Sequence, residues 1–336
     1  PVRVRKVVPK TPAIREQIAA SLKHPLSATR LDAYLTCPLR YYYERLCAIA
    51  PIDEVNEDDD PAAVGVLLHN VLRDFYAPAV GKTVRRDAQS GDPELPFLDE
   101  KALRALFRTA LDASGLEAAL PPESAAMLSV TGPERLGMFL RAQPEQTEVL
   151  SLEEEYDAEI RVGGRIRRLT GNLDRVDWRE QEDPEGAIDE GAVILDYKTG
   201  RIKALRPDIW ADDAFWDALD PEKAASEPDP EHDFLPIMAQ RIPTVQLLYY
   251  CYLYGQATGK PVLDAAFVAL GEDGGERPLF GKGMTIEERE RALSLIPRLI
   301  GFILLHMELC PEFRPREGAH CRWCSWRNVC IISSQQ

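Results

Sequence analysis

The sequence lacks an apolar run long enough to cross a bilayer. Its richest apolar stretch, residues 299–307, is much shorter than the roughly 20 residues that a membrane-spanning helix needs, and no signal-peptide pattern is present. A composition of 45% hydrophobic and 28% charged residues is ordinary for a globular protein with a real core. We therefore expect a cytoplasmic protein with no membrane partner. Because the chain begins at Pro1 rather than Met, we also expect a fragment of a longer protein or a processed form.

Net positive charge is lacking as well, since 40 Lys and Arg against 55 Asp and Glu give a formal charge of −15. Non-specific affinity for DNA comes mainly from basic surface and counterion release, so this balance argues against a strong nucleic-acid binder. The acid is nevertheless concentrated in runs at 53–60, 180–190 and 227–233. Four arginines gather instead in one short segment: Arg161, Arg165, Arg167 and Arg168. Any affinity for DNA is therefore expected to be weak, with a partner protein adding to it.

Two predicted β-strands near the middle of the chain each place a carboxylate near one end. The first lies within GNLDRVDW and carries Asp174, and the second, AVILDYKTG, carries Asp196 and Lys198. Successive side chains in a strand alternate between faces, so Asp196 and Lys198 share one face. Two carboxylates suit Mg²⁺ or Mn²⁺, and a neighbouring ammonium can orient a water or neutralise a developing charge. The pattern points to metal-assisted phosphodiester hydrolysis, the alternative being a solvated surface ion pair.

Two predicted helices carry polar residues that could join these carboxylates. The first, at 64–76, buries an apolar side and places His69 on a neighbouring stripe. The second, at 244–259, carries Gln246 and Tyr250 on one face, four residues apart. A structural histidine and ordinary helix polarity would give the same patterns, so both alternatives stay open at this point.

Three cysteines in the tail, Cys321, Cys324 and Cys330, form the pattern C-x₂-C-x₅-C. In a chain that otherwise has the character of a cytosolic protein, such a group indicates a metal or a cluster rather than disulfides. A tetrahedral Zn²⁺ or a cubane iron–sulfur cluster each needs a fourth ligand. Cys37 lies at a helix break before Pro38, a position more typical of a small buried hydrophobe than of a ligand. The other cysteines fit no spacing and are expected to be buried apolar residues: Cys47, Cys251 and Cys310.

The polarity, proline content and apolar periodicity of the remaining segments divide the chain into an arm and one large domain. Residues 1–25 are polar and punctuated by proline, which is typical of an arm or linker. A helix is expected to begin after Ser27 and to break at Cys37. Residues 97–143 have a helical apolar repeat that predicts a helical insertion, and residues 201–243 are irregular and predict a mobile loop over the cleft.

Strands dominate the middle of the domain. Three are expected over 149–198, with a hairpin turn at 163–164, and a further strand is expected over 261–270. A long helix then starts with a capping box at Thr285 and is expected to be kinked or interrupted at Pro297.

The motifs occur together in one order along the chain, and that order resembles the RecB/AddB-type nucleases of the PD-(D/E)XK superfamily over residues 26–332. The matching motifs are Gly65-x-x-x-His69, Gly171-x-x-Asp174, Asp196-x-Lys198, Gln246-x-x-x-Tyr250 and the arrangement of one plus three cysteines. The resemblance implies an α/β fold with a restriction-endonuclease-like αβββαβ core, in which helices flank a central mixed sheet. It further implies a helical insertion at 97–143, an irregular insertion at 201–243, and an iron–sulfur element formed by 310–332 with Cys37.

The resemblance also assigns roles to single residues. His69, Asp174 and Asp196 are implied as ligands of Mg²⁺ or Mn²⁺, together with the main-chain oxygen of Tyr197. Lys198 is implied to position the attacking water, and Gln246 and Tyr250 are implied to hold DNA phosphate or orient the site. A [4Fe–4S] cluster is implied on four cysteines, with a structural Zn²⁺ as the alternative: Cys37, Cys321, Cys324 and Cys330.

The implied activity is that of an Mg²⁺- or Mn²⁺-dependent deoxyribonuclease, and specifically an exonuclease. It would process single-stranded DNA or duplex ends in DNA repair and recombination, as the nuclease domain of an AddB-like helicase-nuclease with a helicase partner. Three alternatives stay open: a stand-alone iron–sulfur exonuclease of the CRISPR-adaptation type, a catalytically idle DNA-binding scaffold subunit, and a zinc-stapled protein with ordinary surface carboxylates. The intact Asp174, Asp196 and Lys198 argue against the idle scaffold, because a scaffold has no need of that set.

Overall fold

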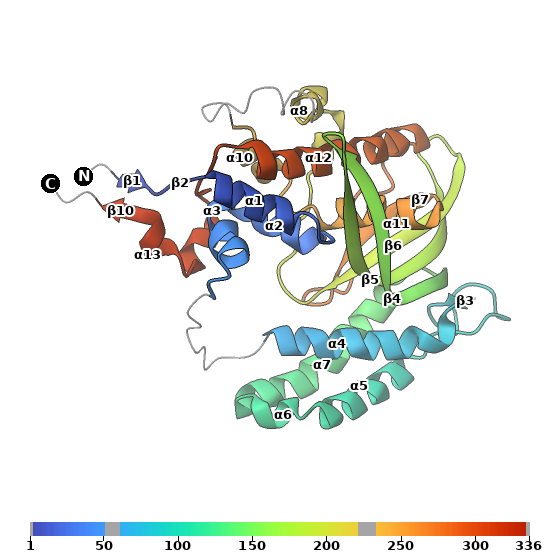
Figure 1. Cartoon of the computed structure of the whole chain (residues 1–336). Helices are drawn as coiled ribbons and strands as arrows, with labels where there is room; N and C mark the ends of the chain where they lie inside the picture. Colours follow the sequence, from blue (N-terminus) through green and yellow to red (C-terminus); the bar gives the residue numbers. More distant parts are fainter. Residues whose placement is uncertain (1–2, 51–60, 221–232, 334–336) are drawn as a thin grey trace.

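A central six-stranded sheet organises the computed structural model, which describes residues 3–50, 61–220 and 233–333 (Figure 1). The strands lie in the order β3-β4-β5-β6-β7-β8, and all neighbours are antiparallel except β6 and β7, which are parallel. Their bounds are β3 Lys82–Arg85, β4 Gln146–Val162, β5 Arg165–Glu182, β6 Ile188–Lys198, β7 Val262–Ala269 and β8 Glu276–Pro278. The sheet is therefore mixed, as predicted. Two of its strands, β3 and β8, were not expected from the sequence.

The three strands that precede α11 form the predicted meander. Gly163 and Gly164 turn the chain between β4 and β5 with φ values of 55° and 74°, a region that glycine enters without steric cost. A helix, α11 Gln246–Thr258, then connects β6 to β7, and such a crossover makes two neighbouring strands parallel. With α4 Pro61–Tyr76 in front, the chain follows the order α4, β4, β5, β6, α11, β7. This is the αβββαβ order expected from the sequence.

Helices cover both faces of the sheet and bury two separate apolar clusters. Successive residues of β6 alternate between these clusters: Ile194 packs with α2 Ala28–Thr36, α11 and α12 Ile286–Leu309, whereas Val193 and Leu195 pack with helices of the second cluster. The second cluster contains α4 and the predicted helical insertion, whose helices gather at one side in Figure 1: α5 Glu100–Ser114, α6 Leu116–Ala119 and α7 Pro122–Ala142. β6 is thus buried on both sides, and its end is held rigidly.

The long helix α12 begins where the sequence predicted. Thr285 and Glu288 form both hydrogen bonds of the capping box. The helix then continues through Pro297 to Leu309, so the expected interruption is absent. Buried residues on both sides of the proline, including Ile296 and Leu299, pack both halves of the helix into the core. Contrary to the expectation from the sequence, α12 is long and apolar enough to cross a membrane by length and composition, but most of its apolar stretch is buried within the fold, as in a core helix.

The first 25 residues differ from the arm or linker that the sequence predicted. Residues Pro12–Ser21 form α1, capped by Thr11, and Ile18 and Leu22 are buried in the core. Only these few apolar residues anchor the helix, which is why the polar, proline-punctuated pattern hid it. Two short antiparallel pairs join this region to the end of the chain, so the termini lie side by side in Figure 1: β1 Arg3–Arg5 with β10 Ile331–Ser333, and β2 Val8–Pro9 with β9 Glu312–Phe313.

Residues 201–243 are also more ordered than the predicted loop. The described part contains η3 Pro207–Ala211, α8 Asp213–Ala218 and α10 Leu235–Arg241, and Trp210 stacks on Trp216 in the core with ring centroids 5.5 Å apart. Residues 221–232, and with them nearly all of the acidic run at 227–233, lie outside the described residues, as does the acidic run at 53–60. The remaining short elements are α3 Pro38–Tyr41, η1 Tyr42–Leu46, η2 Ala77–Ala79, η5 Ala319–Trp323 and α13 Arg327–Cys330.

Candidate functional site

Asp174 lies in the middle of β5 rather than near its end as expected, because β5 is longer than the predicted strand. The pairing of β5 with β6 begins at the next residue, Arg175, so the end of β6 still brings Asp196 and Asp174 together. Asp174 of β5 accepts a hydrogen bond from the backbone N–H of Tyr197 at 2.7 Å, which fixes it beside β6. On β6, the Lys198 ammonium lies 2.6 Å from Oδ2 of Asp196, as expected for two residues on one strand face. Asp196 is buried and Lys198 is partly exposed. The two central strands therefore present two carboxylates and one cation beside the end of β6.

His69 reaches the same point from α4. Its Nδ1 lies 3.5 Å from Oδ2 of Asp174, and its Nε2 lies 3.1 Å from the carbonyl oxygen of Tyr197. A proton on Nε2 is donated to that carbonyl, and the lone pair of Nδ1 then faces the carboxylates. In metal-binding histidines, the ring nitrogen that does not bind the metal usually donates a hydrogen bond of this kind, which orients the imidazole.

A third carboxylate, Glu153 of β4, was missed by the sequence reasoning. Its Oε1 lies 3.8 Å from Nδ1 of His69, and single potential ligand atoms of His69, Glu153 and Asp174 all lie within 4.8 Å of one another. Asn172 donates a hydrogen bond to Oε2 of Glu153 at 2.7 Å. Nothing in the acidic run at 153–155 distinguishes this glutamate from its neighbours. Its place follows from the register that pairs Glu154 with Leu173, and so sets Glu153 across from Asp174.

Gln246 and Tyr250 lie at the start of α11, directly against Asp196. Nε2 of Gln246 donates hydrogen bonds to Oδ1 of Asp196 at 2.7 Å and to the Tyr250 hydroxyl at 3.0 Å. The beginning of α11 is fixed in turn by Asp32 of α2, which accepts from the backbone N–H of Val245 at 2.7 Å. Asp32 was not identified in the sequence, because its partner lies 213 residues away.

Burial and mutual repulsion disfavour the ionised forms of the clustered acids. Burial raises the pKa of Asp174 to about 7, and the charge of Asp196 adds to this rise. Burial also raises the pKa of Asp196, although Lys198 opposes the shift. Burial alone would lower the pKa of His69, but its interactions with Glu153 and Asp174 raise it overall. A divalent cation would relieve this repulsion, and carboxylates with one imidazole are donors that Mg²⁺ or Mn²⁺ accepts.

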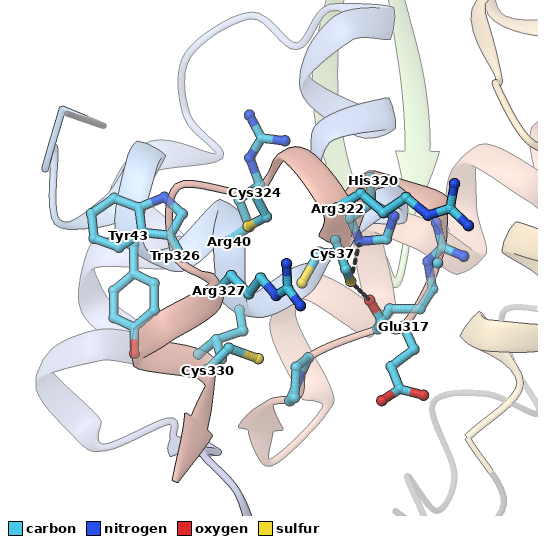
Figure 2. A pocket seen from close by; sticks show the side chains of 15 residues that line it. Cys37, Arg40, Tyr43, Glu317, His320, Arg322, Cys324, Trp326, Arg327 and Cys330 are labelled. Carbon is cyan, nitrogen blue, oxygen red and sulfur yellow. Dashed lines mark hydrogen bonds between the residues drawn. The ribbon is translucent and has the colours of Figure 1, made fainter. Parts of the chain in front are cut away.

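The four cysteines of the predicted cluster line one cavity of about 410 Å³ (Figure 2). Cys37 lies between α2 and α3, Cys321 lies in η5, and Cys330 ends α13, so the cavity joins the two ends of the chain. Cys324 follows η5. Burial raises the pKa of the Cys37 thiol, and Cys324 adds to the rise. Four soft sulfur donors around one space fit a thiolate-bound metal or cluster, whose positive charge would offset that repulsion.

The other three cysteines lie away from this cavity. Cys251 and Cys310 are buried, as predicted. Cys47 is exposed, contrary to the prediction, because the helical segment ends at Leu46 and the chain turns to the surface there.

A family model described as "PD-(D/E)XK nuclease superfamily" matches residues 25–331. No curated protein matches the chain significantly. A solved chain described as "Crystal structure of SSO0001" is similar at 14% sequence identity over 94% of this chain and 93% of that chain, with a TM-score of 0.29. At so low a TM-score, the similarity supports no conclusion about the fold or function of this chain. The family match and the geometry of the site are the observations that bear on function.

Proposed function

Because the chain belongs to the PD-(D/E)XK nuclease superfamily, we propose that it is a metal-dependent DNA nuclease whose centre contains Asp174, Asp196 and Lys198. The observation that carries the proposal is the convergence of these side chains with His69 at the end of β6. A structural role does not require that set, because two acids with raised pKa values at one site destabilise the folded protein unless a cation joins them.

His69, Glu153 and Asp174, whose potential ligand atoms lie within 4.8 Å of one another, would hold the metal. Asp196 would be a further ligand, and the Tyr197 carbonyl lies beside them. When bound, Mg²⁺ or Mn²⁺ lowers the pKa of a water and stabilises charge on the phosphate. Lys198 orients the attacking water from the same strand face as Asp196. Gln246 holds Oδ1 of Asp196 in a fixed orientation, and Tyr250 holds the amide of Gln246.

The sequence motifs support a narrower assignment within the same proposal. The Gln246-x-x-x-Tyr250 pair and the one-plus-three cysteines favour an exonuclease of the RecB/AddB type, which would process DNA ends in repair and recombination with a helicase partner. A stand-alone iron–sulfur exonuclease of the CRISPR-adaptation type is the alternative. A RecB/AddB-type nuclease domain needs a helicase to deliver its DNA strand, whereas a stand-alone exonuclease does not. Processive cleavage from a DNA end without a helicase would therefore favour the stand-alone enzyme.

We assign the four-cysteine cavity to a [4Fe–4S] cluster. Cys37, Cys321, Cys324 and Cys330 are the ligands, and the cavity of about 410 Å³ is much larger than the ~10–15 Å³ that one water needs by the same measure. This volume favours a cluster over a single Zn²⁺. A cluster here would hold α2 and the tail together, and cross-links that close long loops restrict the unfolded chain most.

The test of the activity is cleavage of end-labelled single-stranded and duplex DNA by anaerobically purified protein with Mg²⁺ or Mn²⁺. We expect products that shorten from one end and that disappear when EDTA is added. Protein that carries its metal and its cluster but leaves both DNAs intact would favour an idle DNA-binding subunit instead.

A further inference from the structure

Trp323 is 89% exposed, more than any other large hydrophobic residue in the described part of the chain. It lies in η5, between Cys321 and Cys324, and it does not line the cysteine cavity. The core therefore gains nothing from this ring. An exposed indole presents a flat face on which an unpaired base can stack, and such stacking tolerates any base.

The surface around Trp323 is basic, although the whole chain carries a formal charge of −15. Arg322 and Arg327 are exposed, and neither forms an ion pair with any described residue. Two further arginines line the same cavity with their charges partly engaged: Arg40 pairs with Glu44, and Arg316 donates to the carbonyls of Leu35 and Thr36. Glu317 is the acid that lines this cavity. Cations therefore outnumber acids here, which suits an anionic partner.

Helix α2 joins the cysteine cavity to the metal centre. α2 runs between them: Cys37 at its end faces the cavity, and Asp32 within it anchors the start of α11, where Gln246 contacts Asp196. At 1.5 Å per residue, Asp32 and Cys37 lie about 8 Å apart along the helix.

Lys203 supplies a further cation. It is exposed and follows β6, which ends with Lys198. Lys203 also lines a small pocket together with Thr244, whose hydroxyl donates a hydrogen bond to Asp32, so it lies close to the start of α11.

We propose that this surface binds single-stranded DNA and leads it to the metal centre, with a base stacked on Trp323 and phosphates held by Arg322, Arg327 and Lys203. The inference rests on the proposed nuclease function, because the strand is the substrate of that centre. Single-stranded rather than duplex DNA is the partner, since the bases of a duplex are already stacked on each other and offer no face to an indole.

Binding of a fluorescent dT₂₀ oligonucleotide in EDTA, followed by anisotropy, tests this surface without cleavage. We expect Trp323→Ala to raise the Kd about tenfold or more. Ile188→Ala is the matched control, because Ile188 is 74% exposed and lies at the opposite end of β6 from Lys198, and it should leave the Kd unchanged. Absorbance near 400 nm of the Trp323→Ala protein reports whether the cysteine element is intact.

Salt dependence tests the arginines separately. Removal of each phosphate contact should lower the slope of log Kd against log salt by about 0.7 for single-stranded DNA. We expect this decrease for Arg322→Ala and for Arg327→Ala but not for Arg108→Ala, which changes an exposed arginine of α5.

Wild-type hydrolysis of thymidine 5′-(p-nitrophenyl phosphate) with Mn²⁺ separates the two proposals, because this small ester contacts the metal centre alone. The inference about the surface is overturned if wild-type protein does not bind dT₂₀, or if the Trp323→Ala protein binds it as tightly as wild type. Hydrolysis of the ester in either case upholds the proposed nuclease. If the Trp323→Ala protein binds dT₂₀ more weakly than wild type but wild type hydrolyses neither the ester nor DNA, the surface binds single-stranded DNA and the proposed nuclease function is rejected.

Discussion

The side-chain amide of Gln246 donates a hydrogen bond to Oδ1 of Asp196 at 2.7 Å, which joins the first turn of α11 to the end of β6. The other oxygen of Asp196 faces the Lys198 ammonium. Each carboxylate oxygen thus has a defined neighbour, and the plane of the carboxylate is fixed. Loss of a group that orients a metal-binding residue in this way typically costs about 10- to 100-fold in metal affinity or activity.

Gln246→Ala should therefore reduce DNA cleavage by about 10- to 100-fold while the fold stays intact. The loss arises because Asp196 becomes free to rotate away from the metal. Activity would be measured at saturating Mn²⁺ together with thermal unfolding. Gln256→Ala changes an exposed glutamine at the other end of α11 and should retain full activity. Equal activity in both variants would remove Gln246 from the site.

Glu153→Gln should weaken binding of Mn²⁺ by about tenfold, because it removes one of three carboxylates that face the metal site. Electron paramagnetic resonance of free Mn²⁺ gives the affinity directly, without any cleavage assay. Glu155→Gln makes the same change at an exposed position of the same strand and should bind Mn²⁺ like wild type. Unchanged affinity in Glu153→Gln would mean that this glutamate orients Asn172 and His69 but does not reach the ion.

The buried carboxyl of Asp32 should make the free energy of unfolding depend on pH. Burial raises its pKa from 3.8 to about 6, although hydrogen bonds from Thr244 and Val245 oppose the shift. The folded state therefore holds this proton more tightly than the unfolded state does, and the stabilisation present below pH 4 is lost as pH rises through 6. Between those values the free energy of unfolding of wild type should fall by about 2 kcal/mol relative to Asp32→Asn.

Denaturant unfolding of both proteins at several pH values between 4 and 7 measures this difference. Parallel pH profiles for wild type and Asp32→Asn would show that Asp32 titrates normally, and that the hydrogen bonds to α11 outweigh its burial.

Cys37→Ser should abolish absorbance near 400 nm and the bound iron of anaerobically purified protein, because it removes the one ligand that comes from outside the tail. Cys47→Ser changes an exposed cysteine away from the cavity and should keep both signals. Colourless wild-type protein that contains one zinc per chain would contradict the cluster and leave the cavity as a zinc site.

Local patterns predicted the parts of this site that lie close together in sequence. The alternation of a strand places Lys198 beside Asp196, and the spacing of a helix places Tyr250 beside Gln246, so both contacts follow from the sequence alone. Glu153 and Asp32 could not be found in this way. The first depends on the register between β4 and β5, and the second on a hydrogen bond to a residue 213 positions away.

The fold shows the same division. The αβββαβ order, the hairpin glycines and the cap at Thr285 are encoded within short segments and were predicted. α1 and β3 were missed, because α1 packs through very few apolar residues and β3 is a four-residue edge strand whose pairing with β4 defines it. Tertiary contacts, rather than local propensity, make these elements regular.

The most direct test of the metal centre is cleavage of end-labelled DNA with Mn²⁺ by wild type, Asp196→Asn and Lys198→Ala in parallel, with circular dichroism and absorbance near 400 nm on the same samples. We predict cleavage by wild type alone, with secondary structure and colour retained in all three proteins. Full cleavage by either variant would contradict the assignment of Asp196 and Lys198 to the catalytic centre.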